Sequence, residues 1–291
     1  MSIPSRSQTI FFTVMAMIAF AGNSLLCRAA LRTTGIDAAS FTMIRLSSGA
    51  LALWFIIAIK GEKIGAAGSW LSALALFVYA AGFSFAYISL SAATGALLLF
   101  GAVQVTMISL AVWRGERLGT QQMAGFLLAF GGLCGLLLPG LSAPPLQGAL
   151  LMMAAGVAWG IYSLRARGVS HPTRITAGNF LRAVPFALIV TFAVLLLPFH
   201  GVATLSLPVR GIAYAIASGA VTSGMGYALW YSALRGLTPT SAATVQLVVP
   251  VLAALGGIAF LGEAITSRLV LTSIAILGGI ALVVFSARQV K

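Results

Sequence analysis

Polar amides and aromatic rings inside long apolar stretches are the residues of this chain whose types and spacing suit small-molecule binding. Asn23, Gln104 and Gln246 are amides that lie there, and an amide in such a stretch is rare and needs a hydrogen-bond partner. Aromatic residues recur at helical spacing as Tyr79, Phe83, Tyr87, Trp159, Tyr162, Tyr227 and Trp230. We expect these residues to surround one cavity for an amphipathic solute with an apolar side chain. Ordinary packing or an interfacial belt is the alternative for any single aromatic residue.

Two arginines, Arg45 and Arg182, also lie within apolar stretches, at similar distances from one end. A guanidinium fork fits a carboxylate bidentately, so each is a candidate for recognising an acidic group of a substrate. The alternative is a structural arginine that binds carbonyls where helices pack or extends towards the membrane surface. Their matching depths favour the structural interpretation. We predict structural or gating roles for both, and for Pro250, which removes a backbone hydrogen bond and can kink its helix.

The acidic residues are few and lie outside the apolar stretches. The chain has only Asp37, Glu62, Glu116 and Glu263, all in expected loops or helix ends. A proton-driven carrier normally keeps an ionisable residue within its spans. We therefore expect transport without obligatory proton coupling. Glu116 and Glu263 each follow a glycine that can end a helix, and we expect each carboxylate to cap the helix that comes next.

Catalytic constellations are missing from the apolar stretches. No stretch carries a histidine that could serve a serine nucleophile, and none offers His, Asp or Glu ligands for a metal. A glycine-rich phosphate loop is also missing, which argues against ATP as the energy source. We predict a protein that is not an enzyme and that needs no cofactor and no metal.

Composition requires that the elements positioning these residues span a membrane. Hydrophobic residues make up 60% of the chain and charged residues 7%, whereas a soluble domain has about 25% charged residues. Stretches of about 18–25 apolar residues are long enough to cross a bilayer as helices. The first is expected to be a retained helix and not a signal peptide. Ten spans are predicted, at residues 9–28, 38–59, 69–90, 92–113, 121–138, 147–164, 175–197, 207–232, 238–261 and 269–287.

The net charge of +13 reflects membrane topology. With ten spans and a cytoplasmic N-terminus, most Lys and Arg residues of the loops fall on the cytoplasmic side, as the positive-inside rule requires. Both termini are therefore predicted to be cytoplasmic, and no nucleic-acid partner is expected.

One sequence pattern occurs twice. Gly115-Glu116 precedes Gly131-Gly132 at the same spacing at which Gly262-Glu263 precedes Gly278-Gly279. Self-similarity at half length indicates two copies of one unit. Because each copy has five spans, an odd number, the second must enter the membrane from the opposite side, as in many secondary transporters. We predict a first repeat at residues 1–143 and a second, inverted repeat at 144–291.

Residues 92–132 and 233–279 resemble the repeated unit of the drug/metabolite transporter superfamily, EamA type. The unit has a small-residue turn, an apolar helix, a Gly-Glu loop and a glycine-containing fifth helix. The resemblance implies a ten-helix exporter of metabolites, often amino acids, with the path between two four-helix sets and the fifth and tenth helices peripheral. Within the family the chain resembles the YddG-like exporters of aromatic amino acids. One departure is visible, because Pro250 has Val103 as its counterpart in the first half.

These observations lead to one overall prediction. The chain is an all-α integral membrane protein of a bacterial-type inner membrane, a secondary transporter that exports aromatic or large neutral amino acids by alternating access. Its partners are a small-molecule substrate and the lipid bilayer, and its oligomeric state is open, a monomer included. An exporter of drugs or other metabolites with the same fold, a channel and a membrane protein that transports nothing are the alternatives.

Overall fold

Long helices account for nearly all of the described chain. The protein was analysed as a computed structural model, which describes residues 4–113, 115, 118–140, 143–166, 171–196, 206–237, 242 and 245–286. Within these ranges there is no β-strand. The helices of the first half are α1 (Arg6–Thr33), α2 (Ala38–Ile59), α3 (Trp70–Tyr87), α4 (Ala92–Trp113) and α5 (Thr120–Leu137). Those of the second half are α6 (Leu146–Arg165), α7 (Pro172–Leu196), α8 (Val209–Ile216), η1 (Ala217–Met225), α9 (Gly226–Leu234), α11 (Val248–Leu261) and α12 (Ser267–Ser286).

Nine helical spans of the described chain are long and apolar enough to cross a membrane, with α8, η1 and α9 forming a single span, Val209–Leu234. The tenth predicted span contains α11, a shorter apolar helix, and its residues 238–241 and 243–244 lie outside the described residues. A turn at Leu247 precedes α11. Pro250 accounts for this break, because it has no N–H to donate to the carbonyl of Gln246 and its ring crowds that carbonyl. The prediction of an all-α, multi-pass membrane protein is confirmed, whereas the side on which the termini lie stays a prediction.

Short polar side chains fix where several helices begin. Ser5 accepts a hydrogen bond from the backbone N–H of Gln8, whose side chain in turn accepts one from the N–H of Ser5. The side chains of Asp37 and Ser69 cap α2 and α3 in the same way. Each cap satisfies backbone N–H groups that the first helical turn leaves free.

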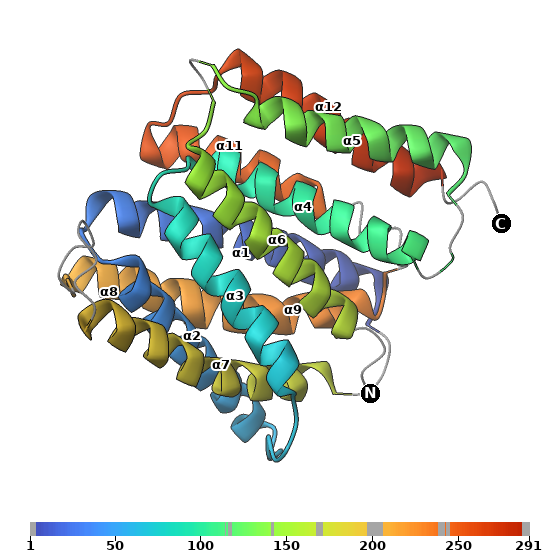
Figure 1. Cartoon of the computed structure of the whole chain (residues 1–291). Coiled ribbons are helices and arrows are strands. Elements are labelled where there is room, and N and C mark those ends of the chain that lie inside the picture. Colours follow the sequence, from blue (N-terminus) through green and yellow to red (C-terminus); the bar gives the residue numbers. More distant parts are fainter. Residues whose placement is uncertain are drawn as a thin grey trace.

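The helices pack in pairs that join the two halves of the chain (Figure 1). Helix α2 packs against α7, α4 packs against α11, and α5 packs against α12. Helix α1 contacts the span formed by η1 and α9, and α6 makes the equivalent contact with α3. Exchanging the halves maps this set of pairs onto itself, as an inverted repeat requires. The α5–α12 pair lies along one edge of the molecule, where the resemblance to the transporter superfamily placed it. The division into repeats at residue 143 stays a prediction.

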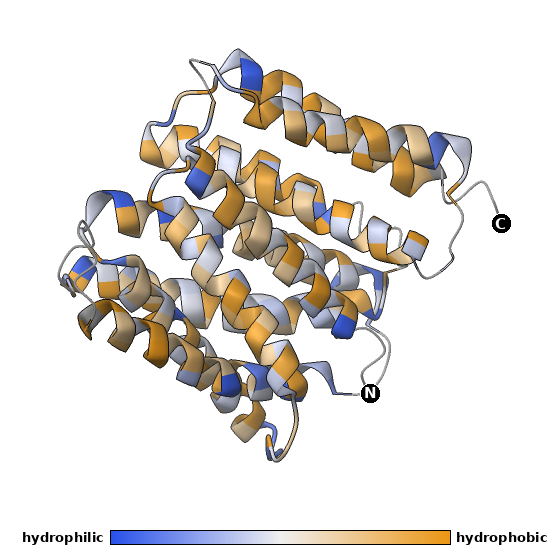
Figure 2. Cartoon of the chain, viewed as in Figure 1, coloured by the Kyte–Doolittle hydropathy of each residue, from blue (hydrophilic) through white to orange (hydrophobic). Residues whose placement is uncertain are grey.

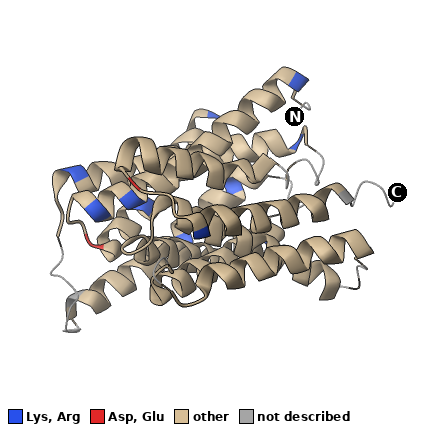
Figure 3. Ribbon diagram, turned by 90° about the horizontal axis from the view of Figure 1, so that it is seen from above, with Lys and Arg blue, Asp and Glu red and all other residues tan. Residues whose placement is uncertain are grey.

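Hydrophobic residues predominate along the helices (Figure 2), and hydrophilic residues gather mainly near helix ends and loops. Large exposed side chains such as Trp54, Phe192 and Leu271 would be costly in water but suit contact with lipid. Figure 3 shows that basic residues outnumber acidic ones, as the composition requires.

Glycines of the repeated motif allow α5 and α12 to approach closely. A Cβ atom on Gly279 would lie 2.5 Å from the carbonyl oxygen of Gly125, and one on Gly132 would lie 2.8 Å from the Ile276 side chain. By contrast, a Cβ on either neighbour in the motif, Gly131 or Gly278, would meet nothing within 4 Å. The second glycine of each Gly-Gly pair is therefore the one that packing demands.

The Gly-Glu motif of the second half joins three helices, α1, α4 and α11. Gly262 ends α11 in the left-handed conformation, with φ of 62°. The next residue, Glu263, accepts a hydrogen bond from the backbone N–H of Ala92 at 2.8 Å and pairs with Arg28 at 3.0 Å. The expectation that Glu263 caps the following helix is wrong, because its carboxylate turns back to the N-terminus of α4. The counterpart Glu116 lies outside the described residues.

Candidate functional site

A small cavity lies among α1, α3, α4, α6, η1 and α9. Ten residues line it: Phe20, Asn23, Ser24, Tyr79, Phe83, Leu99, Phe100, Trp159, Thr222 and Tyr227. Asn23, Tyr79, Phe83, Trp159 and Tyr227 are among the substrate-binding residues predicted from the sequence. The cavity has a volume of about 20 Å³, so in this conformation it has room for little more than one water molecule.

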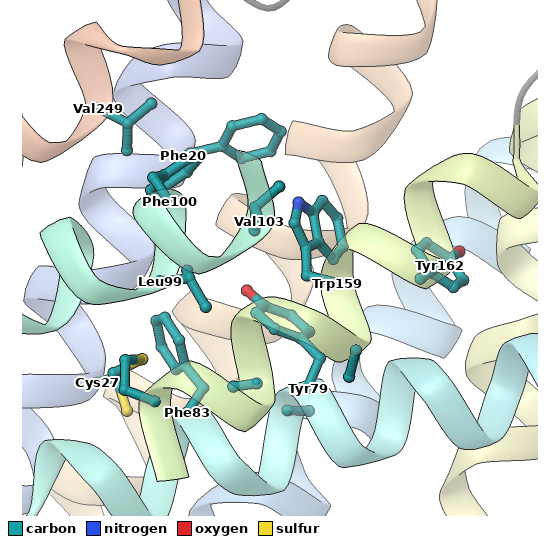
Figure 4. Packing of buried hydrophobic residues seen from close by; sticks show 14 of the residues in the cluster. Phe20, Cys27, Tyr79, Phe83, Leu99, Phe100, Val103, Trp159, Tyr162 and Val249 are labelled. Atoms are coloured by element: carbon teal, nitrogen blue, oxygen red, sulfur yellow. The ribbon is translucent and has the colours of Figure 1, made fainter. Parts of the chain in front are cut away.

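Aromatic rings form most of the cavity wall, and Trp159 lies at their centre. Its ring centroid is 4.8 Å from that of Tyr79, 5.0 Å from that of Tyr227 and 6.4 Å from that of Phe20. Figure 4 shows Tyr79 and Trp159 side by side, with Phe83 and Leu99 next to them. Such a wall presents ring faces and edges to an apolar group and contributes large contact areas.

Two further predicted residues support this wall from outside the cavity. Tyr162 stacks on Trp159 at a centroid distance of 5.5 Å, and Trp230 makes an edge contact with Phe20 at 5.9 Å. Neither lines the cavity. Both are buried, so they hold the orientation of the rings that do.

Asn23 forms the polar side of the cavity together with three hydroxyl groups. Its Nδ2 donates a hydrogen bond to Tyr79 Oη at 3.3 Å. Its Oδ1 accepts hydrogen bonds from Ser218 Oγ at 2.7 Å and from Thr222 Oγ1 at 3.3 Å. All four residues are buried, so the network fixes the amide in one orientation.

The π-helical segment η1 brings its hydroxyl groups to this network. Hydrogen bonds in a π-helix run between residues five apart, so residues four and five apart lie near one face. Ser218, Thr222 and Ser223 therefore point towards α1 and α2 together. Gly219 permits the close approach, because a Cβ there would lie 2.1 Å from the carbonyl oxygen of Arg45.

Arg45 lies on α2 next to the cavity and has no acidic partner among the residues that the structure describes. Its side chain is 1% exposed. Nη2 donates to Tyr79 Oη at 3.0 Å and Nε to Ser223 Oγ at 3.3 Å, whereas Nη1 has no hydrogen-bond partner in the described part of the chain. The guanidinium carbon lies 4.8 Å from the ring centroid of Phe83 and 5.2 Å from that of Tyr79.

Arg182 has different surroundings, although the sequence places it as the counterpart of Arg45. Its Nη1 donates to the carbonyl oxygens of Ala67 and Gly178, and its Nη2 donates to that of Ala66. It is partly exposed at the end of the bundle. These contacts hold the loop before α3 against α7. Arg182 therefore has the structural role, binding to carbonyl oxygens, that the sequence offers as one interpretation of both arginines.

The remaining predicted site residues lie away from the cavity lining. Tyr87 donates to the carbonyl oxygen of Ala92, and Gln246 donates to that of Ala242, so both are occupied by nearby backbone. Gln104 is buried in α4, and Pro250 is buried near the start of α11. Helices α3 and α4 line the cavity through other residues, whereas α11 contributes no lining residue.

Five lining residues were not among the predicted ones: Phe20, Ser24, Leu99, Phe100 and Thr222. Phe20 and Ser24 share the helical face of Asn23, so their spacing alone could have added them. Thr222 could not be found this way, because its orientation depends on the wider turn of η1. Ser24 Oγ and Tyr227 Oη are buried and have no hydrogen-bond partner within the described ranges, so the cavity wall holds two polar groups that a ligand could bind.

Comparison with known proteins shows which family has this arrangement. Residues 146–285 match the family described as the EamA-like transporter family. A relative from Pseudomonas aeruginosa, named Uncharacterized protein PA1977, is 59% identical over 267 residues, which cover 91% of this chain and 90% of the relative. A protein of known crystal structure has the same fold, with a TM-score of 0.68 at 20% identity over 98% of this chain and 100% of its own. The chain is thus a multi-pass membrane protein that belongs to the EamA-like transporter family of the drug/metabolite transporter superfamily.

Proposed function

We propose that the protein is a secondary transporter that exports amino acids with aromatic or large apolar side chains across a bacterial inner membrane by alternating access. The observation that carries this proposal is the cavity among α1, α3, α4, α6, η1 and α9, with an aromatic wall and a polar side built around Asn23. Rings accommodate an apolar side chain, while amide and hydroxyl groups accommodate an amino or carboxylate group. YddG-like specificity, for aromatic amino acids, is the substrate preference that such a wall favours.

Alternating access fits the size and position of the cavity. The space now present is too small for an amino acid, so binding requires the helices around it to move apart. The cavity lies where α1, η1 and α9 meet α3 and α6, which are counterparts in the two proposed repeats. Rocking of one set against the other would expose the cavity to each side of the membrane in turn.

Replacement of Trp159 by Ala is expected to lower saturable phenylalanine flux in liposomes at least tenfold. Trp159 touches three other rings of the wall, so its loss removes the largest apolar surface offered to a substrate. The control is Trp54→Ala, because Trp54 is 54% exposed on the outer surface and should leave flux unchanged. Flux is measured for phenylalanine, alanine and lysine, with counterflow as the sign of a carrier. Equal transport of all three, or flux that does not saturate, contradicts the proposal and favours a broader exporter or a channel.

Collapsing the proton gradient is expected to leave phenylalanine flux unchanged. The acids of the described chain, Asp37, Glu62 and Glu263, do not line the cavity, and Glu263 is held by an ion pair and a backbone hydrogen bond. No carboxylate of the described residues is thus placed to exchange a proton for substrate. The measurement is flux from phenylalanine-loaded liposomes with and without a protonophore, and a steep fall on adding it would contradict gradient-driven transport.

A further inference from the structure

Arg45 is a buried charge whose counter-charge is missing from the described part of the chain. The only ion pair among those residues joins Arg28 to Glu263. Asp37 caps the start of α2 with its side chain, and Glu62 lies in the loop after α2. An arginine stays protonated under all ordinary conditions, and a charge buried without a partner is costly.

The contacts that Arg45 does make offset this cost only in part. It receives cation–π stabilisation from Tyr79 and Phe83, and it donates hydrogen bonds to two neutral hydroxyl groups. Its Nη1 group, although buried, makes no hydrogen bond with any described residue. A purely structural arginine would be expected to use its free donors on carbonyl oxygens, as Arg182 does on three of them.

The residues around Arg45 are also residues of the cavity. Tyr79 and Phe83 line the cavity and lie against the guanidinium group. Tyr79 Oη accepts hydrogen bonds from both Arg45 and Asn23, so one hydroxyl oxygen stands between the charge and the polar side of the cavity. In this conformation the guanidinium is separated from the cavity by a single layer of side chains.

We infer that Arg45 binds the carboxylate group of the transported solute and makes the transporter selective for carboxylates over amides and amines of the same shape. The inference rests on the proposed function and names the residue that recognises one part of the substrate. When the helices part to admit a substrate, rotation of the Tyr79 side chain opens a path from the cavity to Nη1 and Nη2. A carboxylate there accepts two charge-assisted hydrogen bonds and supplies the missing counter-charge.

Arg45 lies beside the cavity, whereas its counterpart in the other half of the chain does not. This difference agrees with recognition of an asymmetric substrate. The counterpart, Arg182, is bound to backbone at the end of the bundle, so of these two arginines only Arg45 has an unpaired donor beside the cavity. An amino acid has a single carboxylate and needs a single such group.

The test compares three probes that share a phenyl group: phenylalanine, phenylalaninamide and 3-phenylpropionate. The first and third carry a carboxylate, and the second carries an amine without one. Binding to the detergent-solubilised wild type is measured by titration calorimetry, and counterflow in liposomes gives an independent reading. Wild type is expected to bind phenylalanine and 3-phenylpropionate at least tenfold more tightly than phenylalaninamide.

Arg45→Gln is expected to reduce this preference to about twofold or less, because the amide keeps hydrogen-bonding capacity but loses the charge. Arg45→Lys should retain an intermediate preference. Arg182→Gln is the matched control, and it should lower thermal stability while leaving the preference intact. A preference that survives in Arg45→Gln, or that Arg182→Gln abolishes equally, overturns the inference.

The wild-type comparison decides the question even if Arg45→Gln does not fold. Equal binding of phenylalanine and phenylalaninamide overturns the role of Arg45 and leaves the proposed transport of aromatic amino acids standing. Binding of none of the three probes overturns the proposed function itself, and this inference with it.

Discussion

Replacing Glu263 by alanine is expected to destabilise the protein by about 3 kcal/mol, because it breaks a buried ion pair by removing one partner. The side chains of Arg28 and Glu263 are 14% and 8% exposed. The substitution leaves Arg28 without its counter-charge and the Ala92 N–H without an acceptor at the start of α4. The carboxylate joins the end of α11 to α1 and α4, so the loss is not confined to one loop.

Equilibrium unfolding in mixed SDS micelles measures this effect. Glu62→Ala is the matched control, since Glu62 lies in a loop and makes no ion pair within the described residues, and it should change the unfolding free energy by less than about 0.5 kcal/mol. Glu263→Gln separates the two contributions, because an amide oxygen can still accept from Ala92 but carries no charge. A loss below about 1 kcal/mol for Glu263→Ala would show that the pair does not hold the helices together.

Gly279→Ala is expected to destabilise the α5–α12 pair by about 3 kcal/mol, a cost typical of overpacking in a close-packed interface. The new Cβ would lie 2.5 Å from the carbonyl oxygen of Gly125 and 2.6 Å from the backbone nitrogen of Ala129. Both are backbone atoms, so relief requires the two helices to move apart. That separation also removes contacts that neighbouring side chains make across the interface.

Gly278→Ala is an unusually close control for this prediction. The two glycines are adjacent in the same helix, but a Cβ on Gly278 would meet nothing within 4 Å. Because alanine is a better helix former than glycine, Gly278→Ala should be neutral or stabilising by up to about 1 kcal/mol. The difference between the two variants in SDS unfolding is therefore the measured quantity. Similar results for both would contradict the close approach of α5 and α12.

The repeated Gly-Glu motif shows which structural features a local sequence pattern predicts and which it does not. The sequence indicates that Gly262 ends a helix, because glycine adopts the left-handed conformation without strain, and the structure has it there. It does not indicate where the Glu263 carboxylate goes. The acceptor was expected to serve the next helix in the chain, but α4 begins closer in space. A side chain caps the nearest free N–H, and proximity in space depends on packing of the whole bundle.

Helical spacing predicted part of the cavity for the same local reason. Asn23, Tyr79 and Trp159 were found because residues three or four apart share a helical face, and aromatic or amide groups on such faces are conspicuous in an apolar chain. Gln104 and Gln246 were equally conspicuous but do not line the cavity. Polarity marks a residue that needs a partner, and it does not specify whether that partner is a ligand or the backbone.

The sequence by itself determined that this chain is a bundle of membrane-spanning helices, and it predicted an internal repeat. Hydropathy and glycine spacing can be read from the sequence alone. Within a bilayer the backbone N–H and C=O groups must form hydrogen bonds inside the protein, and a helix forms them within a single apolar segment. Only the tertiary structure decided that Arg45 and Arg182 differ, and that η1 turns Ser218 and Thr222 towards Asn23. The physical reason is that a buried charge or hydroxyl is defined by what other helices bring within about 3 Å of it. Those neighbours come from residues 34 to 199 positions away in the chain, as in Arg45 with Tyr79 and Asn23 with Thr222.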